Sequence, residues 1–148
     1  MFIIIFYNHR IKTDLPDYVN QVSLEELYGQ SDIIILHVSQ TPQTTEMIDA
    51  AAIAKMRAGV IVINTARGGL INEYDLTQAL TTGKILAAGI DMSKQEPILA
   101  DSPLLTAKNC YITPHIAWAP KETRKRLLDI TISNLMAFLD GKPVNVVN

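Results

Sequence analysis

The sequence predicts an α/β protein with a doubly wound, mostly parallel sheet. Short runs of β-branched and other apolar residues recur along the chain, as at Ile33 to Val38 and at Val60 to Asn64. Runs of this kind, without polar alternation, are typical of strands buried on both faces. Segments with helix caps separate the runs. Strands that alternate with helices favour parallel pairing through right-handed crossovers.

The composition indicates one globular domain. A chain of 148 residues, 48% of them hydrophobic and 19% charged, can bury a core. The formal net charge of −2 gives no electrostatic reason to expect nucleic acid or an acidic membrane as a partner. The single cysteine, Cys110, lies in an apolar run and is expected to be a small core residue. One cysteine, with no secretory signal or membrane span in the sequence, favours a cytoplasmic location.

The first part of the chain predicts two strands and one helix. Phe2 to Tyr7 and Ile33 to Val38 are apolar runs of the buried type. Between them, Ser23 and Glu26 have the spacing of a capping box and start a short helix. Gly29 is expected to end that helix.

The middle of the chain continues the alternation. Asp49 caps a helix that is expected to end at Gly59. Val60 to Asn64 is the next strand, again expected to be covered on both faces. Asn72 then caps a further helix, for which Gly83 is the stop.

The last part predicts two strands and a long helix. Ile85 to Asp91 is a strand that leads into a proline-bearing loop from Ser93 to Pro103, and Cys110 to Thr113 is the final strand. Pro120 suits the first turn of the long helix and Gly141 its end. The helix carries an apolar stripe (Leu127, Leu128, Thr131, Leu135, Phe138 and Leu139) and a basic cluster on its solvated face (Lys121, Arg124, Lys125 and Arg126).

Polar residues follow three of the predicted strands. Arg67 follows the first of these, Asp91 and Glu96 end and follow the second, and His115 follows the last. Because parallel strands bring their carboxyl ends to one edge of a sheet, we expect these side chains to meet there. An arginine can hold and polarise a 2-oxo acid, and a histidine can hand a proton to its carbonyl oxygen. A carboxylate beside the histidine favours the imidazolium form.

Each of these residues also has a simpler interpretation. Arg67 taken alone is a surface arginine in a strand-to-helix turn, and Asp91 is a cap at the end of a strand. Glu96 is a solvated acid in a loop, and His37 is a hydrogen-bonded structural histidine. The residues by themselves therefore suggest keto-acid reduction without deciding it.

Ordered segments over almost the whole chain, among them Leu36-His37-Val38, Ile63 to Gly69 and Thr113 to Ala117, resemble those of the D-isomer-specific 2-hydroxyacid dehydrogenases. Trp118 and the ending from Gly141 to Asn148 are most similar to the branch of glycerate dehydrogenases, also called hydroxypyruvate reductases. The matching segments include Ser31-Asp32, Leu36-His37-Val38, Thr41-Pro42-Gln43-Thr44, Ile63 to Gly69, Gly89-Ile90-Asp91, Glu96-Pro97 and Thr113 to Ala117.

The resemblance implies a Rossmann-like NAD(P)-binding domain that transfers hydride between NAD or NADP and a small 2-hydroxy acid. It implies that Arg67 binds the substrate, that His115 is the general acid/base and that Glu96 pairs with it. It implies no metal site, and it implies a homodimer. The cofactor-binding residues would be Asn8, His37, Val38, Thr65, Ala66, Arg67, Asp91, His115 and Ala117.

The sequence departs from the family in two places. No Gly-x-Gly-x-x-Gly phosphate loop precedes a helix, and the chain starts at what resembles the second strand of the nucleotide domain. Residues 1–148 are therefore expected to be a partial dinucleotide-binding domain, without its first βα unit and without a substrate-binding domain, and weak or inactive alone. Three explanations are open: the chain is a fragment, Phe2 to Tyr7 moves into the vacant central place, or a second chain fills it.

The cofactor and the activity are also open at this point. Where the family usually has an acid that holds the ribose hydroxyls, this chain has Asn8, followed by His9 and Arg10. That exchange favours tolerance of a 2′-phosphate, unless His9 and Arg10 are merely exposed. The alternative function is a non-catalytic remnant that keeps the fold as a nucleotide-sensing or dimerising platform.

Overall fold

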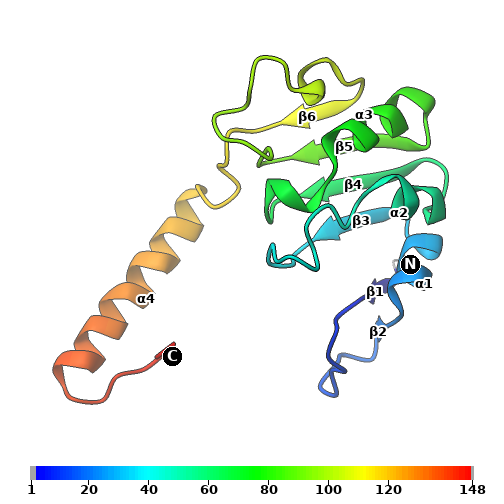
Figure 1. The fold of residues 1–148 in the computed structure, drawn as a ribbon. Coiled ribbons are helices and arrows are strands. Elements are labelled where there is room, and N and C mark those ends of the chain that lie inside the picture. The colour runs from blue at the N-terminus through cyan, green and yellow to red at the C-terminus, as the bar shows by residue number, and fades with distance from the viewer. Residues whose placement is uncertain (1–2, 148) are drawn as a thin grey trace. The chain divides into compact units, whose positions relative to one another are not determined.

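The computed structural model describes residues 3–147, and the chain divides into two compact units, one ending at Pro114 and the other starting at His115 (Figure 1). The first unit contains a four-stranded parallel sheet in the order β3-β4-β5-β6 and a two-stranded parallel sheet, β1-β2. The predicted α/β class is confirmed. The strands are β1 (Ile4–Phe6), β2 (Val19–Gln21), β3 (Ile33–Leu36), β4 (Val60–Asn64), β5 (Ile85–Ile90) and β6 (Cys110–Ile112).

Three α-helices of the first unit start at the residues that the caps predict. Ser23 and Glu26 form both bonds of a capping box before α1 (Leu24–Gln30). Asp49 accepts a hydrogen bond from the amide of Ala52 and starts α2 (Ala50–Lys55). Asn72 accepts from two amides at the start of α3 (Glu73–Thr82), which Gly83 ends at a φ of 78°. Two short 3-10 helices complete the unit, η1 (Gly68–Leu70) and η2 (Pro103–Thr106).

The hydrophobic core lies on one face of the four-stranded sheet. Val60 and Val62 of β4 and Ile34 and Leu36 of β3 are buried there, packed with Leu76 of α3 and other helix residues. On the other face, by contrast, Ile33 and Ile35 are each 51% exposed. The prediction that both faces are covered is therefore wrong for β3, because α1, α2 and α3 contribute their buried residues to one side only. In β4 the other face is partly buried.

The N-terminal strand is shorter and more exposed than predicted. Of the predicted Phe2 to Tyr7, only Ile4–Phe6 is strand, Phe2 lies outside the described residues, and Ile4 is 48% exposed. This strand pairs with β2, which the sequence did not predict, in a sheet separate from β3. The explanation in which it moves into the central place of the larger sheet is therefore wrong.

Several predicted ends are off by a few residues. The α1 helix continues past Gly29 to Gln30, and α2 ends at Lys55, four residues before Gly59. The β3 strand ends at Leu36, so His37 and Val38 follow it instead of belonging to it. The β5 and β6 strands each end one residue earlier than predicted.

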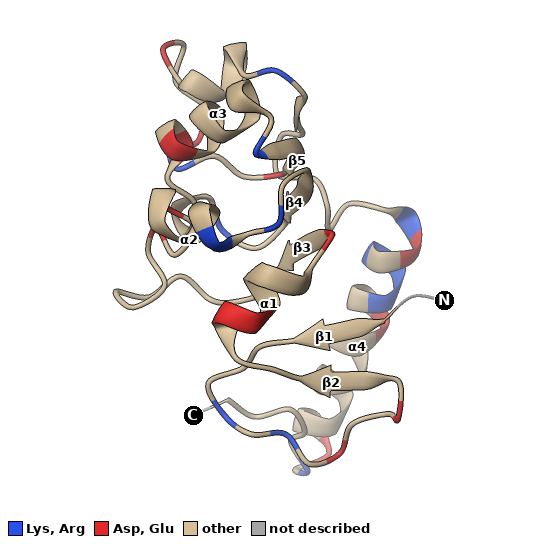
Figure 2. Ribbon diagram, turned by 90° about the vertical axis from the view of Figure 1, so that its right-hand side faces the viewer, with Lys and Arg blue, Asp and Glu red and all other residues tan. Residues whose placement is uncertain are grey.

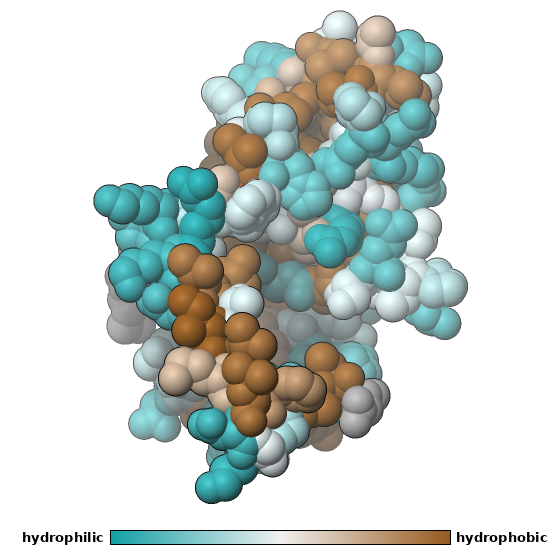
Figure 3. Space-filling model, turned by 90° about the vertical axis from the view of Figure 1, so that its left-hand side faces the viewer, coloured by the Kyte–Doolittle hydropathy of each residue, from teal (hydrophilic) through white to brown (hydrophobic). Residues whose placement is uncertain are grey.

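The second unit consists mainly of α4 (Lys121–Leu139), which Pro120 precedes as N-cap and which ends before Gly141 at a φ of 72°. No residue of this helix is buried, so the predicted apolar stripe is exposed. Figure 3 shows this apolar surface in brown, and Figure 2 shows the basic residues of the first turns in blue. The basic cluster is exposed, as predicted. No helix within residues 3–147 has both the length and the hydropathy for crossing a bilayer.

Candidate active site at the carboxyl edge of the sheet

The turn that carries Arg67 is shaped by the last residue of β4. Asn64 is fully buried, and its side-chain amide donates to the carbonyl oxygen of Arg67 at 2.9 Å. Its side-chain oxygen accepts from the amide of Ala66 at 3.0 Å. Both groups of the amide are thereby satisfied, as a buried polar side chain requires. The turn places the Arg67 side chain at the surface, where its Nη1 donates to the carbonyl oxygen of Ala66 at 2.6 Å.

The same turn lies directly on the loop that follows β5. A Cβ atom added to Gly68 would stand 2.0 Å from the carbonyl oxygen of Ser93. One added to Gly69 would stand 2.4 Å from the side chain of Gln40. Only glycine permits so close a backbone approach. The turn of Arg67 is therefore in direct contact with the start of the loop that carries Glu96.

Asp91 joins the ends of three neighbouring strands. Its carboxyl group is buried, with 4% of the residue exposed, and accepts from the hydroxyl of Thr113 at 2.5 Å. Its amide donates to the carbonyl oxygen of Asn64 at 2.9 Å. The ends of β4, β5 and β6 are thus linked at one edge, as the parallel sheet predicts. Sequence reasoning assigned Thr113 no role at the site, although it lies at a strand end and begins the matching segment Thr113 to Ala117.

The three predicted catalytic residues are distributed over both units. Arg67 and Glu96 are exposed residues of the first unit, on the turn after β4 and on the loop after β5. His115 is the first residue of the second unit, with a φ of 56°, and its carbonyl oxygen accepts from the indole of Trp118 at 3.1 Å. Convergence of His115 with the other two stays a prediction.

The remaining predicted cofactor-binding residues lie on loops or at strand ends. Asn8 follows β1; its side chain accepts from the amide of Arg10, and its carbonyl oxygen accepts from the Gln21 side chain, both at 3.0 Å. His37 is exposed after β3, and Val38 packs partly against the core. Thr65, Ala66 and Ala117 lie on the segments that follow β4 and β6.

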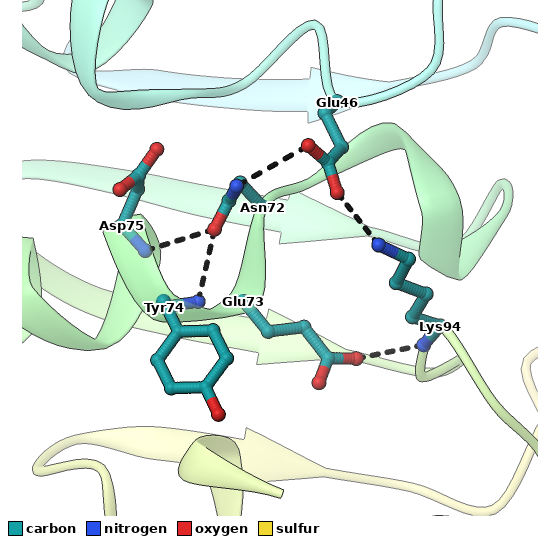
Figure 4. A network of polar contacts seen from close by, with 6 residues as sticks. All are labelled: Glu46, Asn72, Glu73, Tyr74, Asp75 and Lys94. Atoms are coloured by element: carbon teal, nitrogen blue, oxygen red, sulfur yellow. Dashed lines mark hydrogen bonds and ion pairs between the residues drawn. The ribbon is translucent and has the colours of Figure 1, made fainter.

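A polar network beside this edge was not predicted (Figure 4). Glu46 accepts from the ammonium of Lys94 at 2.7 Å and from the Asn72 side chain at 3.2 Å. The hydrogen bond and charge of Lys94 lower the pKa of Glu46, and the same contacts with Glu46 raise the pKa of Lys94. Glu73 accepts from the backbone amide of Lys94 at 2.7 Å. The only local signal was the position of Glu73 next to a helix cap.

The residues at this edge fit the nicotinamide end of a dinucleotide. The loops after parallel strands are where open α/β sheets bind ligands, and the arginine and carboxylates here are suited to charged and amide groups. The sequence has no Gly-x-Gly-x-x-Gly for the pyrophosphate.

Comparison with known proteins agrees with this geometry. Residues 1–117 match the family model described as D-isomer specific 2-hydroxyacid dehydrogenase, NAD binding domain. The chain is 58% identical over 127 residues to a hydroxypyruvate reductase of Blautia hydrogenotrophica, covering 86% of this chain and 39% of the relative. It is 49% identical over 131 residues to a glycerate dehydrogenase of Methylorubrum extorquens, covering 85% of this chain and 41% of the relative.

Solved structures show the same arrangement of elements. An acyclic imino acid reductase in complex with NADPH and D-Arg superposes with a TM-score of 0.87 at 31% identity, covering 99% of this chain and 46% of that chain. The present chain spans about two-fifths of the length of the curated relatives it matches, whose covered shares are 39% and 41%.

Proposed function

Because this chain belongs to the D-isomer-specific 2-hydroxyacid dehydrogenases and matches their NAD-binding domain, we propose that it forms the nicotinamide half of a hydride-transfer site. The substrate class is a small 2-hydroxy or 2-oxo acid of the glycerate and hydroxypyruvate type, as in the names of its relatives. The observation that supports this most is the linkage of three strand ends through Asn64, Asp91 and Thr113. That linkage fixes the starting points of the segments that carry the three reactive residues.

Each reactive side chain has one role. The Arg67 guanidinium binds the substrate carboxylate and polarises the adjacent carbonyl group. The imidazole of His115 holds the proton for the carbonyl oxygen, and Glu96 favours the protonated form of that imidazole. The bound nicotinamide cofactor supplies the hydride.

The finer assignments belong to the same proposal. The chain acts as a partial nucleotide domain in a cytoplasmic homodimer, and Asn8 with Arg10 makes NADP acceptable beside NAD. Because the sequence has no Gly-x-Gly-x-x-Gly, turnover by the 148-residue chain alone is expected to be weak. The same absence favours the second candidate, a non-catalytic nucleotide-sensing or dimerising domain.

The two candidates are separated by calorimetry on the purified chain. NADH and NADPH are titrated first, and hydroxypyruvate is then titrated onto the nucleotide-bound protein. We expect heat in both steps for the wild type. Arg67→Gln should weaken acid binding by about ten- to a hundredfold, the value of a charged hydrogen bond, and should weaken nucleotide binding less, because Arg67 is one of several residues expected to contact the cofactor.

The matched control is Arg57→Gln, which removes a surface arginine paired with Asp32 at 2.7 Å. It should leave both heats unchanged. Nucleotide heat without acid heat would select the sensing domain, and no heat in either step would select the dimerising platform. Rapid turnover of hydroxypyruvate by the chain would contradict the expectation of weak activity.

A further inference from the structure

One carboxylate holds both ends of the loop that carries Glu96. Glu73, the first residue of α3, accepts from the amide of Lys94 through Oε1 at 2.7 Å. Through Oε2 it accepts from the hydroxyl of Ser102 at 3.1 Å. Glu96 lies between these two residues in the sequence. Hydrogen bonds to an ionised acceptor are about twice as strong as neutral ones, so Glu73 acts as a clamp on this loop.

Within the loop Ile98 packs against the core, whereas the residues next to Glu96 do not. A pocket of about 450 Å³ lies between the loop and the start of α3, lined by Glu73, Tyr74, Ile98 and Leu99 among others. The segment Gln95 to Pro97 is exposed. A loop with few buried apolar contacts is free to move unless its polar contacts fix it. The two bonds to Glu73 at Lys94 and Ser102 therefore help to fix the course of the loop on either side of Glu96.

The clamped end of the loop is also tied to the turn of Arg67. The Lys94 ammonium pairs with Glu46 at 2.7 Å (Figure 4). The backbone amide of Glu46 donates to the carbonyl oxygen of Gly69 at 2.8 Å. Next to this link, Gly68 lies against the backbone of Ser93. The segments of Arg67 and Glu96 are thus joined by ionic, polar and steric contacts in one small region.

We propose that Glu73 is a positioning residue. By accepting hydrogen bonds from Lys94 and Ser102, it holds the loop so that Glu96 keeps its position relative to Arg67. This inference rests on the proposed function, in which Arg67 binds the substrate and Glu96 favours the protonated form of His115 at the same site. Glu73 itself does not touch the substrate; it acts through the loop.

The clamp is tested by Glu73→Ala in the full chain, with amide hydrogen exchange followed by NMR across residues 94–102. We expect the amide of Lys94 to exchange about ten- to a hundredfold faster, since it loses a charged acceptor. The carboxyl carbon signal of Glu96 should move toward that of an unstructured glutamate. The control is Glu25→Ala, which removes another first-turn helix glutamate with a lysine partner, Lys55 at 3.4 Å, and should change neither readout.

Two milder variants keep the test decisive if Glu73→Ala does not fold. Glu73→Gln keeps an acceptor for one end of the loop and should show a smaller increase in exchange. Ser102→Ala frees one end only and should leave the amide of Lys94 protected. The Glu96 signal separates positioning from general loosening, because loss of stability alone would not move it in the folded protein.

Calorimetry separates a failure of the clamp from a failure of the proposed function. Unchanged exchange and an unchanged Glu96 signal in Glu73→Ala overturn the clamp, whatever the wild type binds. Faster exchange with an unmoved Glu96 signal overturns the positioning role. If exchange in Glu73→Ala is faster as expected but the wild type binds no 2-oxo acid, the clamp stands and the proposed function is overturned. With both correct, Glu73→Ala weakens acid binding at least about tenfold and keeps nucleotide binding.

Discussion

At the scale of single residues, Cys110 shows how surroundings set the chemistry of a side chain. It is half-buried at the start of β6 and packs against the core, as its apolar sequence context predicts. Burial, with a smaller contribution from the charge of Glu73, raises the pKa of its thiol to about 11. The thiolate is the reactive form of cysteine. The residue is therefore a small core residue and a poor nucleophile at neutral pH.

Alkylation with iodoacetamide checks this assignment. At pH 8 we expect Cys110 of the folded protein to react about a hundredfold more slowly than a cysteine with an ordinary pKa of about 8.5. The rate should rise about tenfold per pH unit up to about pH 10, because the thiolate fraction does. The urea-unfolded chain is the control and should react at the ordinary rate. A folded-state rate that levels off near pH 8.5 would contradict the raised pKa.

At the scale of elements, the turn after β4 owes its position to a glycine. Gly68 is buried, and its α-carbon faces the backbone of Ser93, which cannot move aside as a flexible side chain would. Gly89, in β5, is different, because an added Cβ would meet nothing within 4 Å. The two glycines give a matched pair for testing the contact between the turn and the loop.

Urea unfolding of Gly68→Ala and Gly89→Ala measures that contact. Gly68→Ala is expected to lower the free energy of unfolding by about 3 kcal/mol, the upper range for overpacking against a rigid neighbour. Gly89→Ala should change it by about 1 kcal/mol or less, and toward greater stability, because alanine restricts the unfolded chain. Equal effects of the two substitutions would show that the turn does not lie on the loop.

The elements that sequence reasoning predicted correctly are those fixed by neighbours in the sequence. Ser23 and Glu26 are three residues apart, so both partners of the capping box are visible in the sequence. The β2 strand was not predicted because two of its three residues, Asn20 and Gln21, are polar. It is a strand because it pairs with β1. The α1 helix runs past Gly29 because that glycine does not take the left-handed conformation that ends a helix. Gly59 does take it, at a φ of 79°, but α2 has already ended at the extended residue Met56, so Gly59 belongs to the turn before β4.

In the candidate site, too, some residues could be predicted from the sequence and others could not. Arg67 and Asp91 could be placed because they follow predicted strands, and parallel strands share an edge. The clamp by Glu73 could not, because Lys94 and Ser102 are 21 and 29 residues away in the chain. Nothing in a single sequence reports contacts between loops at that separation. The motif residues could therefore be predicted from the sequence pattern, whereas the residues that position them were identified only in the structure.

At the scale of the whole molecule, the four-stranded sheet is covered on one face by α1, α2 and α3. Ile34 and Ile35 are neighbours in β3 and point to opposite faces, with exposed fractions of 3% and 51%. An uninterrupted apolar run gave no sign of this difference, since such runs are typical of strands covered on both sides. The residues on the open face are apolar all the same, and a large exposed apolar patch marks an interaction surface.

A pair of substitutions in β3 reports whether this face is open in solution. Ile34→Ala leaves a cavity and is expected to lower the free energy of unfolding by about 2–5 kcal/mol. Ile35→Ala should lower it by about 1 kcal/mol or less if half of that side chain is exposed, since only part of its transfer free energy is at stake. Urea unfolding at two protein concentrations, with sedimentation of the native protein, provides the measurement. If Ile35→Ala costs as much as Ile34→Ala and the cost grows with protein concentration, this face is covered by a second copy, and the proposed homodimer forms through the sheet.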